Sequence, residues 1–68
     1  MLQHFLAECC TSDPAARVSA RELFNVFKAM PRVESWRRAR FINELLRAKI
    51  DVRQERGGLY VYGLTIVA

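Results

Sequence analysis

The sequence predicts a small α+β domain in which three short helices precede a C-terminal β-hairpin. Three early segments repeat apolar residues at helical spacing, the last segment is rich in β-branched and aromatic residues, and two adjacent glycines divide it. The chain has 68 residues, of which 51% are hydrophobic and 26% charged, as is typical of a globular protein. A chain this short buries only about 60% of the surface that its unfolded form exposes. We therefore expect one domain, residues 1–68, with a modest core.

Capping and turn residues delimit the first two helices. The first helix has one apolar face, made by Leu2, Phe5, Leu6 and Cys9. Thr-Ser-Asp-Pro at residues 11–14 favours a turn, after which a brief extended link at Arg17-Val18 is expected. Ser19 and Glu22 then form the Ser-x-x-Glu pattern of a capping box. The second helix has an apolar face of Ala20, Leu23, Phe24 and Phe27, and Pro31 marks its end.

The third helix is expected to begin after Ser35 and to run to about Lys49. Helical periodicity predicts that its apolar side consists of Ala39, Ile42 and Leu46, flanked by Phe41 and Leu45. Its opposite side presents Trp36, Arg40, Asn43 and Arg47. The helix is thus apolar on one side and rich in arginine on the other.

The C-terminal segment predicts a hairpin that turns at Gly57-Gly58. A two-residue primed turn requires positive φ at both central positions, which glycine adopts readily. In this register Arg53 faces Tyr62 and Glu55 faces Tyr60, and these four side chains share one face of the hairpin.

The expected order is helix, short strand, two helices and hairpin, which is the order of a winged helix. Helices two and three would form a helix-turn-helix with Pro31–Glu34 as the turn, and the hairpin would be the wing. The predicted fold class is therefore a small α+β winged helix.

The net charge of +4 lies wholly in the second half of the chain. Residues 1–31 have three basic and three acidic side chains, whereas residues 32–68 have eight basic and four acidic ones. A cationic field concentrated in this way indicates a polyanionic partner, although a merely solvated basic face has the same composition.

Several short motifs resemble the C-terminal winged-helix domain of phage and plasmid primase-helicases of helicase superfamily three, which also includes the poxvirus-type enzymes. These motifs are Phe5-Leu6, Cys9-Cys10, Val18 and Leu23-Phe24, then Phe41 with Leu45, and the ending GGLYVYGLTIVA at residues 57–68. Where the family often has a tryptophan near the end of the second helix, this chain has Lys28-Ala29-Met30. The resemblance implies a role in DNA replication. Walker-type motifs are absent from the sequence, so helicase or primase activity would belong to another part of a parent chain.

The predicted DNA-binding residues are those of the basic third helix and of the wing. Arginine bridges the acceptors of guanine and asparagine pairs with adenine, so we expect Arg40 and Asn43 to approach base edges. The expected phosphate contacts are Arg37, Arg38 and Arg47 on the helix and Arg53 and Arg56 on the wing. The alternatives are a solvated helix face and an edge strand kept polar to prevent self-pairing.

The aromatic residues, the cysteines and the histidine are expected to have structural rather than binding roles. We expect Trp36 in the core, Tyr60 and Tyr62 packed across the hairpin, and the sole histidine, His4, on the surface. Cys9 is expected in the core and Cys10 half-buried, both reduced. The sequence offers no nucleophile–base pair, metal-ligand set or glycine-rich phosphate loop, so we expect neither catalysis nor a metal or cofactor.

The sequence thus predicts a cytoplasmic DNA-binding module of phage or plasmid replication, with duplex DNA favoured over single-stranded DNA. A parent helicase core or a second copy of the chain would be a further partner, and no membrane association is expected because neither a signal peptide nor a long apolar run is present. The alternative is a protein-interaction or oligomerisation module without DNA binding of its own.

Overall fold

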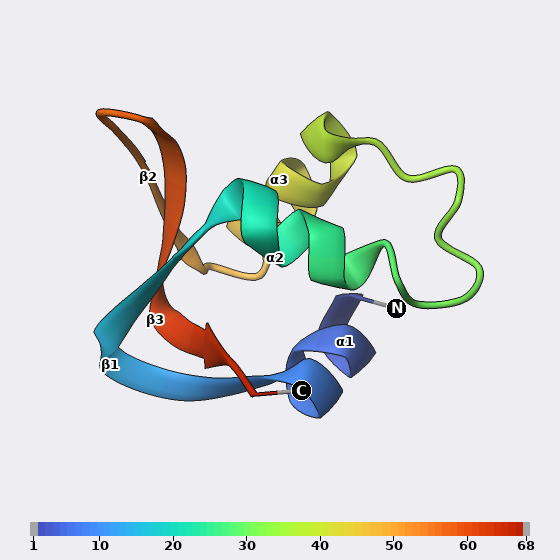
Figure 1. Cartoon of the computed structure of the whole chain (residues 1–68), viewed down its shortest axis with the longest axis horizontal. Coiled ribbons are helices and arrows are strands. Elements are labelled where there is room, and N and C mark those ends of the chain that lie inside the picture. Colours follow the sequence, from blue (N-terminus) through green and yellow to red (C-terminus); the bar gives the residue numbers. More distant parts are fainter. Residues whose placement is uncertain (1, 68) are drawn as a thin grey trace.

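The computed structural model describes residues 2–67, in which three helices pack on one side of a three-stranded sheet (Figure 1). In chain order the elements are α1 (Leu2–Cys9), β1 (Cys10–Ser19), α2 (Ala20–Phe27), α3 (Arg38–Arg47), β2 (Asp51–Glu55) and β3 (Gly58–Ile66). The sheet is antiparallel with the strand order β1-β3-β2, so β3 is central. The helices cover one face of the sheet and leave the other face open.

The first strand is much longer than expected. A turn at residues 11–14 and a brief link at Arg17-Val18 were predicted, but β1 pairs with β3 at both of its ends, from Cys10 opposite Ile66 to Ser19 opposite Tyr60. Of the predicted turn, Asp13 and Pro14 lie in an irregularity between Ser12 and Arg17, where the Ala15 amide donates to the Asp13 carboxylate at 3.1 Å. Pro14, which has no amide hydrogen, therefore lies where the ladder is interrupted, and the chain bends without leaving the sheet.

This strand overturns the predicted fold class. The elements follow the expected order α-β-α-α-β-β, but the three-stranded antiparallel sheet makes this a mixed α+β fold and not a helix-rich winged helix. The C-terminal hairpin is not a separate wing, because β1 pairs along β3 and makes the hairpin part of a full layer. The connection between α2 and α3 also spans residues 28–37 rather than the short turn expected at 31–34.

The hairpin turn lies one residue earlier than predicted. Arg56 and Gly57 form the turn, Glu55 pairs with Gly58, and Arg53 pairs with Tyr60 instead of Tyr62. Gly57 has a φ of 99°, a conformation that glycine adopts without steric cost. Moving the turn by one residue shifts each cross-strand partner by two positions, and side chains two positions apart lie on the same face of a strand. Arg53, Glu55, Tyr60 and Tyr62 therefore still share one face, as expected.

The core is built around a cluster of aromatic rings. Phe27 lies at its centre, with ring centroids 5.2 Å from Phe5, 4.9 Å from Phe41 and 5.0 Å from Trp36. The buried positions of Phe41 and Leu45 fix the rotation of α3 about its axis. Its predicted apolar side was therefore partly wrong, because Ala39 and Leu46 are exposed.

Two further side-chain assignments changed with the tertiary structure. Cys10 is buried and Cys9 is only partly so, the reverse of the expectation, because the chain passes from α1 to β1 between them and helical spacing no longer applies. The Ser19 cap on α2 is confirmed by a 3.0 Å hydrogen bond from the Glu22 amide, but α3 begins after Arg37 and not after Ser35. Ser35 lies instead in a turn in which the Trp36 amide donates to the Val33 carbonyl.

Candidate nucleic-acid interface on α3

The outward face of α3 brings together three of the predicted residues. Arg40, Asn43 and Arg47, from successive turns of the helix, line one shallow hollow together with Glu44 and Leu46. Because Phe41 and Leu45 point into the core, residues on the opposite side of a 3.6-residue helix must face solvent. The predicted stripe of Arg40, Asn43 and Arg47 is accordingly exposed.

Arg40 is held by a contact with the predicted core residue Trp36. Its guanidinium carbon lies 4.0 Å from the centroid of the Trp36 ring, a cation–π geometry. Trp36 is only 9% exposed, as expected for a core residue, and packs edge-on against Phe27. Trp36 thus connects the guanidinium of Arg40 on the outward face of α3 to the aromatic core.

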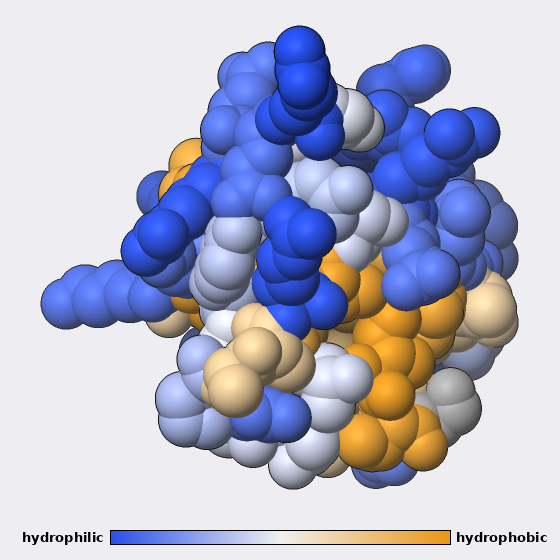
Figure 2. All heavy atoms as spheres, turned by 60° about the vertical axis from the view of Figure 1, so that its left-hand side comes forward, coloured by the Kyte–Doolittle hydropathy of each residue, from blue (hydrophilic) through white to orange (hydrophobic). Residues whose placement is uncertain are grey.

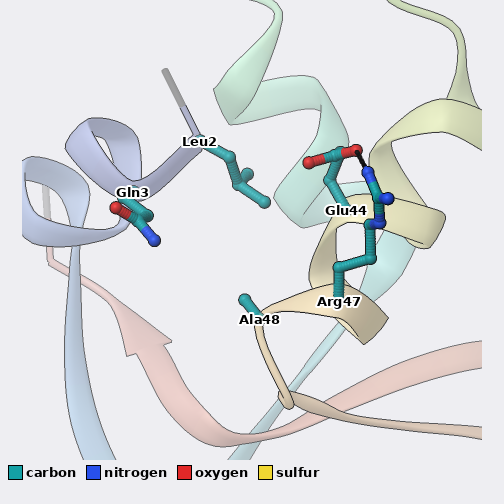
Figure 3. A pocket seen from close by; sticks show the side chains of 5 residues that line it. All are labelled: Leu2, Gln3, Glu44, Arg47 and Ala48. Atoms are coloured by element: carbon teal, nitrogen blue, oxygen red, sulfur yellow. Dashed lines mark hydrogen bonds and ion pairs between the residues drawn. The ribbon is translucent and has the colours of Figure 1, made fainter.

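Arg47 lies between two hollows. Besides the hollow on the outward face, it lines a smaller one of about 240 Å³ with Leu2, Gln3, Glu44 and Ala48, between α1 and the end of α3 (Figure 3). Arg47 and Glu44 form an ion pair at 3.5 Å, and the arginine side chain is 80% exposed. An exposed pair of this kind contributes only a few tenths of a kcal/mol, so a stronger anion can displace Glu44.

The first turn of α3 is cationic. Arg37 occupies the N-cap position without a side-chain hydrogen bond, Arg38 follows, and the turn contains no acidic residue. Both arginines are exposed. Since a helix N-terminus carries partial positive charge, these cations are unfavourable for the isolated helix. An anionic ligand would relieve that repulsion.

The two arginines of the hairpin do not line the hollow on α3. Arg53 donates two hydrogen bonds of 2.9 and 3.1 Å to Asp51 Oδ2, and its guanidinium lies 4.7 Å from the Tyr62 ring centroid. The hydrogen bond to Asp51 and the charge of that carboxylate raise the pKa of Arg53 above its ordinary value. Arg56 lies exposed in the turn.

The open face of the sheet has a polar cluster in which Glu55, Tyr60 and Tyr62, which were expected on one face, are joined by Arg17 of β1, which was not predicted there. The Arg17 guanidinium stacks 4.4 Å from the Tyr60 ring centroid and forms an ion pair with Glu55, to which the Tyr62 hydroxyl also donates. Only the pairing of Arg17 with Tyr62 across β1 and β3 could have revealed it.

On this side of the molecule hydrophilic residues gather in the upper part and a hydrophobic area lies at the lower right (Figure 2). With Arg53 and Asp51 included, the cluster is balanced in charge, so it does not extend the cationic surface.

The histidine and the two cysteines lie away from the outward face of α3. His4 is exposed, as expected, and lies 3.6 Å from Glu8. Burial, and secondarily the neighbouring Cys9, raise the pKa of the Cys10 thiol. Within the same residues, no three His, Cys, Asp or Glu side chains cluster as a metal site would require. None of the helices described is long and apolar enough to cross a bilayer.

Comparisons with known protein families, with curated proteins and with solved structures found no match to this chain. The resemblance to primase-helicase C-terminal domains therefore stays a prediction from short motifs.

Proposed function

We propose that this domain binds DNA, duplex in preference to single-stranded, through the outward face of α3. The observation that carries the proposal is the convergence of Arg40, Asn43 and Arg47 on one exposed hollow. An α-helix with its side chains is about 10–12 Å across, and the major groove of B-DNA is about 12 Å wide. The face combines cations for phosphates with an amide that can pair with a base edge.

The local charge supports a polyanionic ligand. Between residues 37 and 49 there are five basic side chains and one acidic side chain, Glu44. Glu44 is only weakly engaged with Arg47, so the face keeps most of its positive charge. Arg37 and Arg38 extend this surface to the beginning of the helix, where phosphate oxygens would also be favoured by the helix dipole.

The hairpin has a smaller role in this proposal than the sequence suggested. Arg56, exposed in the turn, is a candidate for a backbone contact. Arg53 would first have to give up its hydrogen bonds to Asp51. An association with phage or plasmid replication, and with the helicase core of a parent chain, rests on the sequence resemblance alone.

Fluorescence anisotropy with labelled duplex and single-stranded DNA, over about 50 to 300 mM salt, tests the proposal. Neutralisation of about four phosphates gives a slope of log K against log salt near −3 to −4. The double variant Arg40→Ala/Arg47→Ala should weaken binding and make the slope shallower by about 1, because Arg47 is its phosphate contact whereas Arg40 faces the base edges. Arg21→Ala removes an exposed arginine from α2 and serves as the control.

Two outcomes would overturn the proposal. One is the absence of binding at low salt by a protein that circular dichroism shows to be folded, which would favour the protein-interaction alternative. The other is an equal loss of binding free energy per removed charge in Arg21→Ala and in the double variant, which would mean that net charge and not the α3 face determines binding.

A further inference from the structure

Leu46 is an apolar side chain on the polar outward face of α3. Its side chain is 52% exposed, although sequence periodicity assigned it to the core. Phe41 and Leu45 already occupy the core side of the helix, and a rotation that buried Leu46 would draw them out of the aromatic cluster. The fold therefore leaves Leu46 in solvent without using it for packing.

Leu46 lies beside the one amide of the same face. Asn43 precedes it by three residues, a spacing that places Cβ atoms about 5–6 Å apart on a helix surface, and both residues line the hollow flanked by Arg40 and Arg47. The hollow thus presents a hydrogen-bonding amide and an apolar isobutyl group side by side, between two cations.

This pair of groups matches one kind of base pair. In the major groove, adenine offers the N7 acceptor and the N6 donor that an asparagine amide can contact together, and thymine offers a methyl group. A G·C pair has neither that donor–acceptor pattern nor a methyl group. On the basis of the DNA-binding function proposed above, we propose that α3 selects A·T base pairs, with Asn43 contacting adenine and Leu46 packing against the thymine methyl group.

Removal of the methyl group from DNA tests this directly. Affinities would be measured for an A·T duplex, for the same duplex with deoxyuridine in place of every thymine, and for a G·C duplex of equal length. Wild-type protein should bind the A·T duplex about tenfold more tightly than the G·C duplex. It should lose about fourfold in affinity per contacted methyl group on the deoxyuridine duplex.

Three variants test which residue is responsible for the methyl-group response and which for the A·T preference. Leu46→Ala should bind the thymine and deoxyuridine duplexes equally, whereas Asn43→Ala should lose the preference for A·T over G·C and keep the response to the methyl group. Val67→Ala shortens the other large exposed apolar side chain of residues 2–67, which is 60% exposed and does not line the hollow, and should behave as wild type. Comparison of ratios within each variant removes any general effect of deoxyuridine on duplex shape.

The two proposals fail in different ways. Salt-sensitive duplex binding in which wild type does not distinguish thymine from deoxyuridine, or in which Leu46→Ala keeps the wild-type ratio, would overturn the base preference alone. No binding to any of the duplexes would overturn the DNA-binding function and the base preference with it.

Discussion

The guanidinium of Arg40 rests on the indole ring of Trp36, 4.0 Å from its centroid, while the same ring packs edge-on against Phe27 in the core. Trp36 precedes α3 and Arg40 belongs to its first turns, so this contact joins the α2–α3 connection to the outward face of the helix. The position of one candidate DNA contact is thereby linked to the packing of the aromatic cluster.

The first prediction concerns this contact. Arg40→Ala should uncover the Trp36 ring, shift its fluorescence emission to longer wavelength and lower the free energy of unfolding by about 0.5–1 kcal/mol. Trp36 is the only tryptophan, so the emission reports on this site alone. Arg38→Ala is the control, and an unchanged emission maximum in Arg40→Ala would contradict the stacking.

The second prediction concerns Lys28, whose ammonium donates to three carbonyl oxygens of the α2–α3 connection. The distances are 2.9 Å to Val33, 2.9 Å to Glu34 and 3.2 Å to Trp36. Lys28→Met should lower the free energy of unfolding by about 1–2 kcal/mol, because these carbonyls lose a charged donor. Urea denaturation measures this, with Lys49→Met as the control that removes the other lysine. Equal stability of the two variants would mean that Lys28 does not organise the connection.

The third prediction concerns the end of α3, where Lys49 has a φ of 63°. The Ile50 amide donates to the Leu45 carbonyl and the Lys49 amide to that of Leu46, the pattern of a Schellman motif with a non-glycine residue in the left-handed position. Lys49→Gly should raise the free energy of unfolding by about 1 kcal/mol, because glycine adopts this conformation without steric cost. Lys49→Ala, which removes the same charge and keeps the strain, should give no such gain in thermal denaturation.

The fourth prediction concerns the uncapped beginning of α3. Arg37→Ser supplies a side-chain oxygen at the N-cap and removes a cation from the positive end of the helix. It should stabilise the domain by about 1 kcal/mol and, if the proposed function is correct, weaken DNA binding. A variant that gains stability and keeps full affinity would exclude Arg37 from the interface.

The fifth prediction concerns pH and the buried thiol of Cys10, whose pKa is raised by desolvation and by Cys9. The free energy of unfolding should be unaffected by this group well below the ordinary cysteine pKa of 9.0. It should decline as the pH rises further, because the unfolded thiol ionises first, and should level off above the folded pKa. In a Cys9→Ser variant, ultraviolet thiolate absorbance should titrate at higher pH in the native protein than in urea. Coincident titrations would contradict the effect of burial.

The sequence predicted the helices and the hairpin because local signals are strong there. Each of these signals depends only on residues that are close together in the sequence: the Ser19 cap, the apolar spacing of α1 and α2, and the glycines near residue 57. Two of the predicted boundaries nevertheless moved. The hairpin turn shifted by one residue, and the start of α3 moved to Arg38, because Lys28 and the Val33–Trp36 turn hold the preceding residues.

Neighbouring residues in the sequence were not enough to predict the strand β1 or the rotation of α3 about its axis. Residues 11–14 have turn-forming side chains, and only pairing with β3, more than forty positions along the chain, makes the segment a strand. Likewise the apolar residues of α3 spread over nearly half of its circumference, and periodicity alone placed Leu46 at the centre of the apolar side with Phe41 and Leu45 on its flank. Contact of Phe41 with Phe27 and Phe5 turned the helix so that this flank became the buried side and Leu46 was left exposed.

The sequence by itself determined the charge asymmetry, the number of helices and the side of α3 on which Arg40, Asn43 and Arg47 lie, since these follow from composition and helical spacing. Only the tertiary structure decided that the hairpin belongs to a three-stranded sheet, that Arg53 is paired with Asp51 and that Leu46 faces solvent beside Asn43. The physical reason is that strand pairing and core packing join residues far apart in the chain, and their free energy outweighs the weak local preferences of the segments concerned.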